Sequence, residues 1–185
     1  MPSGPSRTFV TGFGPFLDVT ENPSATIAEA VANAKGRPYR ILEVSFEAVE
    51  EFLISLDPDS FDRLVLLGVA DSRKQVMPEL FARNYIGHAK DVRGNDRMGP
   101  IEEGGPLLIE GTLWSNELLS AEITSPDIEV SLDAGTYLCN YIYYRALRTL
   151  PGKRIGFCHV PGVAHLAVAR STELVGHLID DVEVA

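Results

Sequence analysis

Short apolar segments alternate with amphipathic segments along most of the chain. Strands are predicted by the β-branched or continuously apolar runs at residues 7–12, 40–46, 63–69, 127–132 and 154–160. Helices are predicted by the helical spacing of apolar residues at 25–34, 47–56 and 165–179, and after Thr136. This alternation predicts a three-layer α/β/α sandwich around a twisted, largely parallel (mixed) central sheet.

The middle of the chain, residues 70–119, lacks a regular pattern. Its stretches G-N-D-R-M-G-P and E-E-G-G-P predict turns and loops rather than an independent domain. Trp114 lies there among polar residues, and we expect it in the core because tryptophans are usually mostly buried; a subunit contact is the alternative. We therefore expect one domain over residues 1–185, of which residues 1–6 are a flexible leader.

Composition narrows the compartment and the classes of partner. The 185 residues are 45% hydrophobic, and their net charge of -10 argues against nucleic acid or an anionic membrane as the main partner. The N-terminus lacks a signal-peptide pattern, and no apolar stretch approaches the roughly 18 residues of a membrane span. The two cysteines have no CxxC spacing, so we expect neither a zinc motif nor a disulfide framework. A cytoplasmic setting, in which thiols stay free, fits this composition.

Cys139 is the first candidate for chemistry. It lies in D-A-G-T-Y-L-C-N, where a Gly-Thr step leads from a strand-like run into a helical pattern. With Thr136 as the N-cap, Cys139 would be the third helical residue, where the positive end of the helix dipole stabilises a nucleophilic thiolate. The alternative is a small buried residue on a core-facing helix, and for an isolated cysteine the pattern favours that interpretation.

A cysteine hydrolase also needs a base and a group that orients the base. Among the four histidines, His159 stands out because it ends a predicted strand, although a hydrogen-bonded core histidine fits that position equally well. The neighbouring Cys158 points to the opposite face of the strand and is expected in the core. Many carboxylates could orient His159, and the pattern alone does not choose among them.

Five segments add information that spacing alone does not supply. They are V-T-G-F-G-P-F…N-P-S from Val10, G-V-A-D-S-R-K-Q-V-M-P-E-L-F-A-R-N from Gly68, P-I-E-E-G-G-P from Pro100, D-A-G-T-Y-L-C-N from Asp133 and G-F-C-H-V-P from Gly156. In this order they resemble motifs of the pyroglutamyl-peptidase I (pyrrolidone-carboxylate peptidase) family of cysteine peptidases, which remove N-terminal pyroglutamate. The resemblance covers residues 10–161, and five segments in order are far more specific than any one of them.

The resemblance implies a catalytic triad and an acyl-transfer mechanism. It assigns Cys139 as the nucleophile, His159 as general base and then acid, and Glu79 as the group that orients His159. No metal or organic cofactor is needed for this chemistry. The implied partners are peptides with N-terminal pyroglutamate, and a homo-oligomer is expected because family members are commonly tetramers.

The resemblance also implies a small, mostly apolar pocket for the lactam ring. By position in the motifs, its walls are Phe13, Phe16, Tyr137 and Leu138. Ordinary core packing is the alternative for these four, above all for Leu138. Val69 is the fifth substrate-binding position that the resemblance implies. Many bacterial members carry there a glutamine that contacts the lactam, and Val69 cannot make that hydrogen bond.

Two other functions stay open at this point. The same triad could act on a different small N-acyl or lactam substrate, because Val69, Asp71 and Ser72 depart from the family pattern. A catalytically silent homologue could serve as a binding protein, although the presence of all three triad residues counts against that function.

Overall fold

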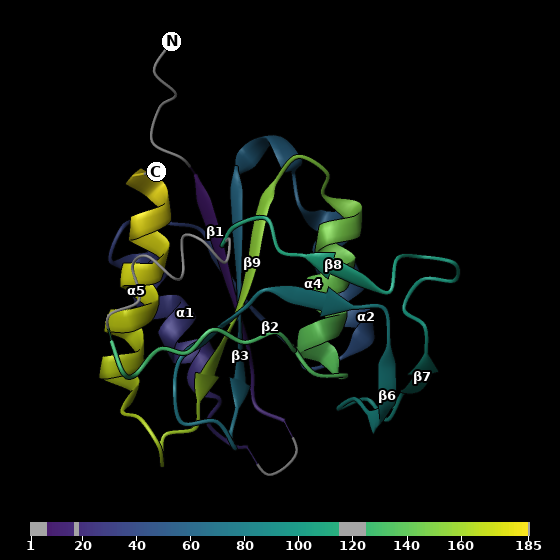
Figure 1. The fold of residues 1–185 in the computed structure, drawn as a ribbon, viewed down its shortest axis with the longest axis horizontal. Coiled ribbons are helices and arrows are strands. Elements are labelled where there is room, and N and C mark those ends of the chain that lie inside the picture. Colours follow the sequence, from purple (N-terminus) through teal and green to yellow (C-terminus); the bar gives the residue numbers. More distant parts are fainter. Residues whose placement is uncertain (1–6, 17–18, 115–124, 185) are drawn as a thin grey trace.

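The computed structural model describes residues 7–16, 19–114 and 125–184 of the chain. They form the predicted three-layer α/β/α sandwich around a mixed, mostly parallel sheet (Figure 1). The leader predicted at residues 1–6 lies outside the described residues.

The helices and strands alternate in the first and last thirds of the chain, with short strands between them. In chain order they are β1 (Thr8–Phe13), α1 (Pro23–Asn33), β2 (Tyr39–Leu42), α2 (Phe46–Ser55), the 3-10 helix η1 (Pro58–Ser60), β3 (Arg63–Ala70), β4 (Met77–Glu79), β5 (Phe81–Arg83), β6 (Ile86–Lys90), β7 (Asp96–Gly99), β8 (Leu108–Glu110), α4 (Leu138–Thr149), β9 (Arg154–Pro161) and α5 (Val168–Val184).

The central sheet has the strand order β2-β1-β3-β9-β4. The first four strands are parallel, so their carboxyl ends meet at one edge of the sheet, and β4 runs antiparallel to β9. Helices α1 and α5 cover one face, and α2 and α4 cover the other (Figure 1). The carboxyl edge of such a sheet, beside the start of a covering helix, is where sites usually form in this class of fold.

The alternation of side chains along β3 divides the core into two clusters. Leu64 and Leu66 belong to the cluster under α2 and α4, which is rich in aromatic rings. Val65 and Leu67 belong to the mainly aliphatic cluster under α1 and α5. Both faces of β3 are therefore buried, as its continuous apolar run predicted.

Local hydrogen bonds set where the first two helices begin. Asn22 caps α1 by accepting a hydrogen bond from the Ser24 N–H at 3.1 Å, and Pro23 occupies the first turn, where its missing N–H costs little. Ser45 caps α2 by accepting from the Ala48 N–H at 3.2 Å. The predicted strand at 40–46 is wrong in its second half, because this cap turns the chain into a helix and β2 ends at Leu42.

The middle of the chain holds more regular structure than its composition predicted. Besides β4, two small antiparallel sheets form there, β5 with β8 and β6 with β7. Their strands have three to five residues, too short to show a period between glycines and prolines. Conversely, the strand predicted at 127–132 is wrong, because it makes only isolated bridges from Ile128 to Val76 and from Ser131 to Glu79.

The C-terminal helix and Trp114 lie together on one side of the sheet. Helix α5 begins later than predicted, at Val168, and continues to Val184. Trp114 is buried under α5, and its indole N–H donates a hydrogen bond of 3.2 Å to the Leu178 carbonyl. Trp114 is therefore a core residue, as expected.

Candidate active site

Glu79 and His159 meet because of the register between β4 and β9. In this ladder Glu79 lies opposite Phe157 and Met77 lies opposite His159, so Glu79 and His159 are diagonal neighbours on one face of the sheet. His159 Nδ1 lies 2.6 Å from Glu79 Oε1, and both side chains are almost fully buried. The imidazole also packs against the ring of Phe157, with ring centroids 4.8 Å apart. Two of the three predicted triad residues therefore form a buried hydrogen-bonded pair.

Cys139 reaches the same face of the sheet from the start of α4. The N-cap of α4 is Tyr137, so Cys139 is the second helical residue, and the prediction of Thr136 as the cap is wrong. The thiol packs against Gly68 of β3, where an added Cβ would lie 2.7 Å from Cys139 Sγ. Gly68 lies directly opposite His159 in the β3–β9 ladder. Cys139 is thus brought next to the strand position of the histidine, at the carboxyl edge of the sheet.

A hollow of about 50 Å³ adjoins the thiol. Its walls include all five residues predicted to bind the substrate ring, together with the sulfur-bearing residue itself. The full lining among the described residues is Phe13, Phe16, Asn22, Val44, Val69, Tyr137, Leu138 and Cys139. The sequence alone did not identify Asn22 as a wall, since its capping role explained it, and Val44 carried no signal distinguishing it from a core residue.

The walls of this hollow are mostly apolar, and its one side-chain amide is already engaged. Asn22 Oδ1 accepts hydrogen bonds from the Ser24 N–H and hydroxyl, and Asn22 Nδ2 donates to the Gly14 carbonyl. The Tyr137 hydroxyl points away to the Lys90 carbonyl, at 2.8 Å. A ligand in the hollow would therefore meet apolar side chains on most sides.

Burial sets the protonation of Cys139 and His159. Removal from water, with a smaller contribution from the Glu79 charge, raises the pKa of the Cys139 thiol to about 12. Burial also lowers the pKa of His159, although its hydrogen bond to Glu79 opposes that shift. The resting site therefore holds a neutral thiol and a neutral imidazole. The easier ionisation expected from the helix start is outweighed by the loss of solvation.

Comparison with known proteins identifies the family. The family model described as pyroglutamyl peptidase matches residues 6–185. The chain belongs to the pyroglutamyl peptidase family. The family is one of cysteine peptidases, so the chain is a hydrolase of that class, as the five sequence segments implied.

Two curated relatives are pyrrolidone-carboxylate peptidases. The one from Halalkalibacterium halodurans is 33% identical over 174 residues, covering 85% of each chain. The one from Saccharolobus islandicus is 36% identical over 169 residues, covering 81% of this chain and 77% of the relative.

Solved structures of the family share the fold. Pyroglutamyl peptidase I from Bacillus amyloliquefaciens superposes with a TM-score of 0.84 at 25% identity, covering 97% of this chain and 98% of that one. Pyrrolidone carboxyl peptidase from Thermus thermophilus gives a TM-score of 0.77 at 31% identity, covering 93% and 96%.

Arg73 is a second side-chain partner of Glu79, and the sequence did not single it out. Its Nη1 donates a hydrogen bond of 2.6 Å to Glu79 Oε1, the oxygen that also contacts His159. An arginine in a loop after a strand is usually a surface residue, so pattern gave no signal for this contact. Its place in the matched segment that begins at Gly68 was the only hint.

The other candidate residues lie apart from this pair. Cys158 is buried in the opposite cluster, under α1 and α5, as its strand position predicted. His88 is exposed on β6 and pairs with Asp96 at 3.1 Å. His165 lies in the exposed turn after β9.

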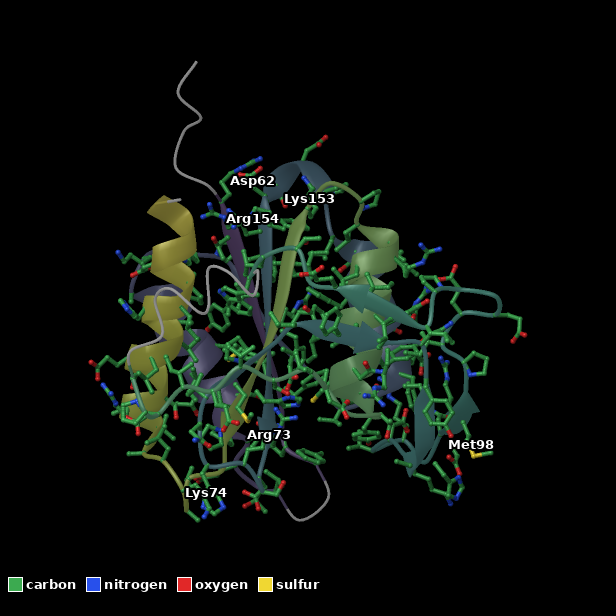
Figure 2. All side chains as sticks on the ribbon, viewed as in Figure 1. Asp62, Arg73, Lys74, Met98, Lys153 and Arg154 are labelled. Carbon is green, nitrogen blue, oxygen red and sulfur yellow. The ribbon has the colours of Figure 1, made fainter. Side chains whose placement is uncertain are left out.

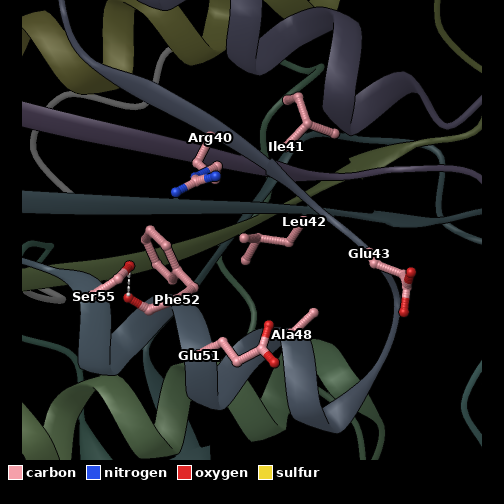
Figure 3. Close-up of a pocket in the computed structure, with 8 residues that line it drawn as sticks. All are labelled: Arg40, Ile41, Leu42, Glu43, Ala48, Glu51, Phe52 and Ser55. Carbon is pink, nitrogen blue, oxygen red and sulfur yellow. Dashed lines mark hydrogen bonds between the residues drawn. The ribbon is translucent and has the colours of Figure 1, made fainter.

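A larger hollow of about 290 Å³ lies between the edge strand β2 and helix α2 (Figure 3). Its polar side chains are those of Arg40, Glu43, Glu51 and Ser55. It contains no cysteine or histidine, and it is lined by the edge strand farthest from β4 in the sheet order. Chemistry therefore favours the smaller hollow beside Cys139 as the site.

The described residues contain neither a cluster of metal-binding side chains nor a helix able to span a membrane. Within residues 7–16, 19–114 and 125–184, no group of three or more histidine, cysteine, aspartate or glutamate side chains is arranged to hold a metal ion. None of the helices in that part of the chain combines the length and the apolarity needed to span a membrane.

Proposed function

We propose that this chain removes N-terminal pyroglutamate from peptides, with Cys139 as nucleophile, His159 as general base and acid, and Glu79 as the group that orients His159. One observation carries the proposal. The buried Glu79–His159 pair, with 2.6 Å between Oε1 and Nδ1, lies on the sheet face that Cys139 covers beside an apolar hollow. Family membership supports pyroglutamyl peptides as the substrates.

The first half of the reaction makes a thioester. Glu79 accepts the Nδ1–H of His159, which leaves the other ring nitrogen free to take the thiol proton. Cys139 Sγ then attacks the pyroglutamyl carbonyl carbon and forms a tetrahedral intermediate. The imidazolium, stabilised by the Glu79 carboxylate, returns the proton to the leaving amine as the C–N bond breaks. The shortened peptide departs with a free amino group.

The second half releases the acid. His159 takes a proton from a water molecule, whose oxygen attacks the thioester carbonyl. Collapse of the second intermediate breaks the C–S bond and returns the proton to Cys139, so the thiol is regenerated together with free pyroglutamic acid. In both halves a negative oxygen develops, and the first N–H groups of α4 lack intrahelical partners and can donate to it. One such donor is typically worth about 3 kcal/mol.

The test is a panel of fluorogenic amides that differ only in the N-terminal blocking group. We expect release of the fluorophore from the pyroglutamyl amide and none from free aminoacyl amides, with the activity absent in Cys139→Ala. Full activity in Cys139→Ala would contradict the mechanism. Absence of any turnover by a folded wild-type protein that still binds pyroglutamyl peptides would favour the silent binding homologue.

A second candidate substrate class is favoured by the lining of the hollow. Val44 and Val69 stand there as apolar walls, and the Asn22 oxygen is already taken by Ser24. A pocket that recognises its ligand mostly by shape separates analogues by only about 10–200-fold, whereas one built to hydrogen-bond rejects the mismatched analogue by about 10⁴-fold or more. The same triad would then also accept other small N-acyl groups, such as cyclopentanecarbonyl.

Kinetics with the pyroglutamyl and cyclopentanecarbonyl amides decides between these substrate classes. A preference below about 200-fold supports the broader class, and one above about 10⁴-fold excludes it. Val69→Gln, which adds an amide to the wall, should raise the preference for pyroglutamate. Val69→Met is the matched control, because it adds similar bulk without the amide.

We also propose that the chain acts as a single-domain, cytoplasmic homo-oligomer, a tetramer by resemblance to its family. The net charge of -10 disfavours nucleic acid and anionic membranes as partners. Large apolar side chains that are mostly exposed, at Met98, Leu107 and Leu108, suit a subunit contact. Light scattering of the purified protein tests the state, and a monomer at micromolar concentration would contradict it.

A further inference from the structure

Arg73 lies where the two halves of the candidate site meet. It follows β3 in a turn closed by the hydrogen bond from its own N–H to the Ala70 carbonyl, at 2.9 Å. Figure 2 shows it near the lower end of the sheet, where the arrowheads of β3 and β9 lie. Its side chain is mostly buried, with 23% of its surface exposed. A charged side chain held this far from water is expected to have a specific partner.

The guanidinium has partners on both sides of the site. Nη1 donates to Glu79 Oε1 at 2.6 Å and also lies 3.3 Å from the Met77 sulfur. Nη2 donates to the Asp133 backbone carbonyl at 2.7 Å. One planar group therefore joins the acid that holds His159 to the chain segment that leads into α4.

The Glu79 carboxylate depends on Arg73 for a compensating positive charge. Its side chain is fully buried, and within the described residues its second oxygen, Oε2, has no hydrogen-bond partner. The histidine is neutral at rest, so among the described contacts of this carboxylate only Arg73 brings a full positive charge. A buried carboxylate without such a partner is costly.

The other end of the bridge fixes the segment that presents the nucleophile. Asp133 starts the loop at residues 133–137 that leads into Cys139, and this loop turns through Gly135 at φ +82°. The Asp133 side chain is separately held by the Gly135 N–H and by Arg83. Arg73 thus contacts the backbone of the loop, while Arg83 contacts only its exposed carboxylate.

We propose that Arg73 is a positioning residue of the reaction, which holds Glu79 in place for His159 and fixes the loop at residues 133–137 relative to that pair. The inference rests on the proposed function of Cys139 and His159. Arginine suits the task because its rigid fork offers two donors at a fixed spacing, whereas a lysine ammonium is a single point charge. Lysine at this position would keep the charge beside Glu79 and lose the bridge.

Charge gives this role a signature that a merely structural residue lacks. The charged or titratable groups facing His159 are Glu79 from β4, Arg73 from the turn after β3, and Asp133 and Cys139 from the segment that starts α4. The Arg73 cation disfavours protonation of His159, so its removal should raise the pKa of His159. The acidic limb of kcat/KM would then move to higher pH.

The experiment compares Arg73→Lys, Arg73→Met and wild type across a pH series with the pyroglutamyl amide. For Arg73→Lys we expect kcat/KM to fall by about 10- to 100-fold, as for a small misplacement of catalytic groups, with the acidic limb at the wild-type pH. For Arg73→Met we expect a larger fall and an acidic limb displaced to higher pH. Arg83→Met is the matched control, because it removes an arginine that contacts Asp133 without touching Glu79, and it should leave both quantities unchanged.

Alkylation of Cys139 by iodoacetamide gives a readout that needs no substrate. The Arg73 cation favours the thiolate, so in Arg73→Met the rise of the alkylation rate should move to higher pH.

Wild-type kinetics in both variants would overturn the proposal. So would equal losses in the two variants with both pH profiles unmoved, since that result marks a structural residue. If Arg73→Met does not fold, Arg73→Lys alone decides, because wild-type kcat/KM in that variant excludes the bridge. Failure of the wild type to cleave pyroglutamyl amides would contradict the proposed function and leave the alkylation arm to judge Arg73.

Discussion

The pKa values of the two cysteines are shifted in the same direction by the same causes, but the two side chains have different neighbours. Burial raises the pKa of both thiols, and the charge of Glu79 adds to the shift in each case. Cys139, however, packs against Gly68 beside the hollow, on the face that carries His159. Cys158 faces the aliphatic cluster on the other side of β9, with no exposed surface. The acidity of the thiol therefore does not distinguish the proposed nucleophile from the core residue, whereas contact with the hollow and a place on the face of His159 do.

The same single-atom change, from sulfur to oxygen, should affect the two positions very differently. Cys139→Ser should lower kcat by up to about 10⁶-fold, the scale for loss of a hydrolytic nucleophile, because a hydroxyl is a far weaker nucleophile in this site. Cys158→Ser should keep kcat within a few-fold. Steady-state kinetics on both purified variants measures the contrast, and equal losses would refute the division of roles.

The next largest effect concerns the Glu79–His159 pair, which lies on the sheet face of Cys139 and not on that of Cys158. Glu79→Gln keeps the size of the side chain but removes the charge that stabilises the imidazolium of His159. We expect kcat to fall by about 10⁴-fold, as when the orienting acid of a hydrolytic triad is neutralised. Circular dichroism should stay unchanged, which separates this loss from unfolding. An activity close to wild type would show that His159 is oriented by another group.

Alkylation distinguishes the two cysteines without any substrate. In the native protein we expect iodoacetamide to modify Cys139 and spare Cys158, and in urea to modify both. Because the pKa of Cys139 is about 12, the thiolate fraction keeps growing with pH, so its alkylation rate should still rise between about pH 7 and 10. Peptide mapping by mass spectrometry assigns the sites. A rate already level near pH 6 would instead indicate a resting thiolate–imidazolium pair.

The smallest effect is on stability. Cys158→Ala removes a buried sulfur and should cost about 1 kcal/mol of unfolding free energy while leaving kcat unchanged. The folded state raises the pKa of Cys158, so the stability linked to it is complete below the unfolded thiol's pKa, about 8.5, and is lost as pH rises further. The difference in unfolding free energy between variant and wild type, measured by urea denaturation, should therefore become smaller above about pH 8.5. A constant gap would mean that Cys158 does not carry this linkage.

The sequence predicted the helices and strands that are long enough to show a regular pattern of apolar and polar residues. Strands β1, β3 and β9 and helix α1 were located to within a few residues, because each carries a continuous pattern with a turn or cap at its end. Strand β4, which carries Glu79, has three residues and no period of its own. Its position follows from pairing with β9, a contact between residues about 80 apart that no local pattern encodes.

The candidate site divides in the same way. The five predicted substrate-binding residues line the hollow beside Cys139, and Glu79 forms a hydrogen bond with His159. These roles came from resemblance to a family rather than from spacing. Asn22 and Val44 were missed as walls, and Arg73 was missed as a contact of Glu79. The position of each of these three residues depends on how the loops fold back over the edge of the sheet. The pattern of apolar and polar residues does not encode how closely a loop approaches that edge.

The close contact between Gly68 and Cys139 limits which residues can stand at position 68. A side chain there would lie 2.7 Å from Cys139 Sγ and 2.8 Å from the ring of Phe157, so even one methyl group requires the sulfur or the ring to move. The sheet thus reserves for the thiol the volume that any other amino acid would fill. An alanine at this point would displace either the thiol of Cys139 or the buried ring of Phe157, so the same substitution would disturb both the candidate site and the core.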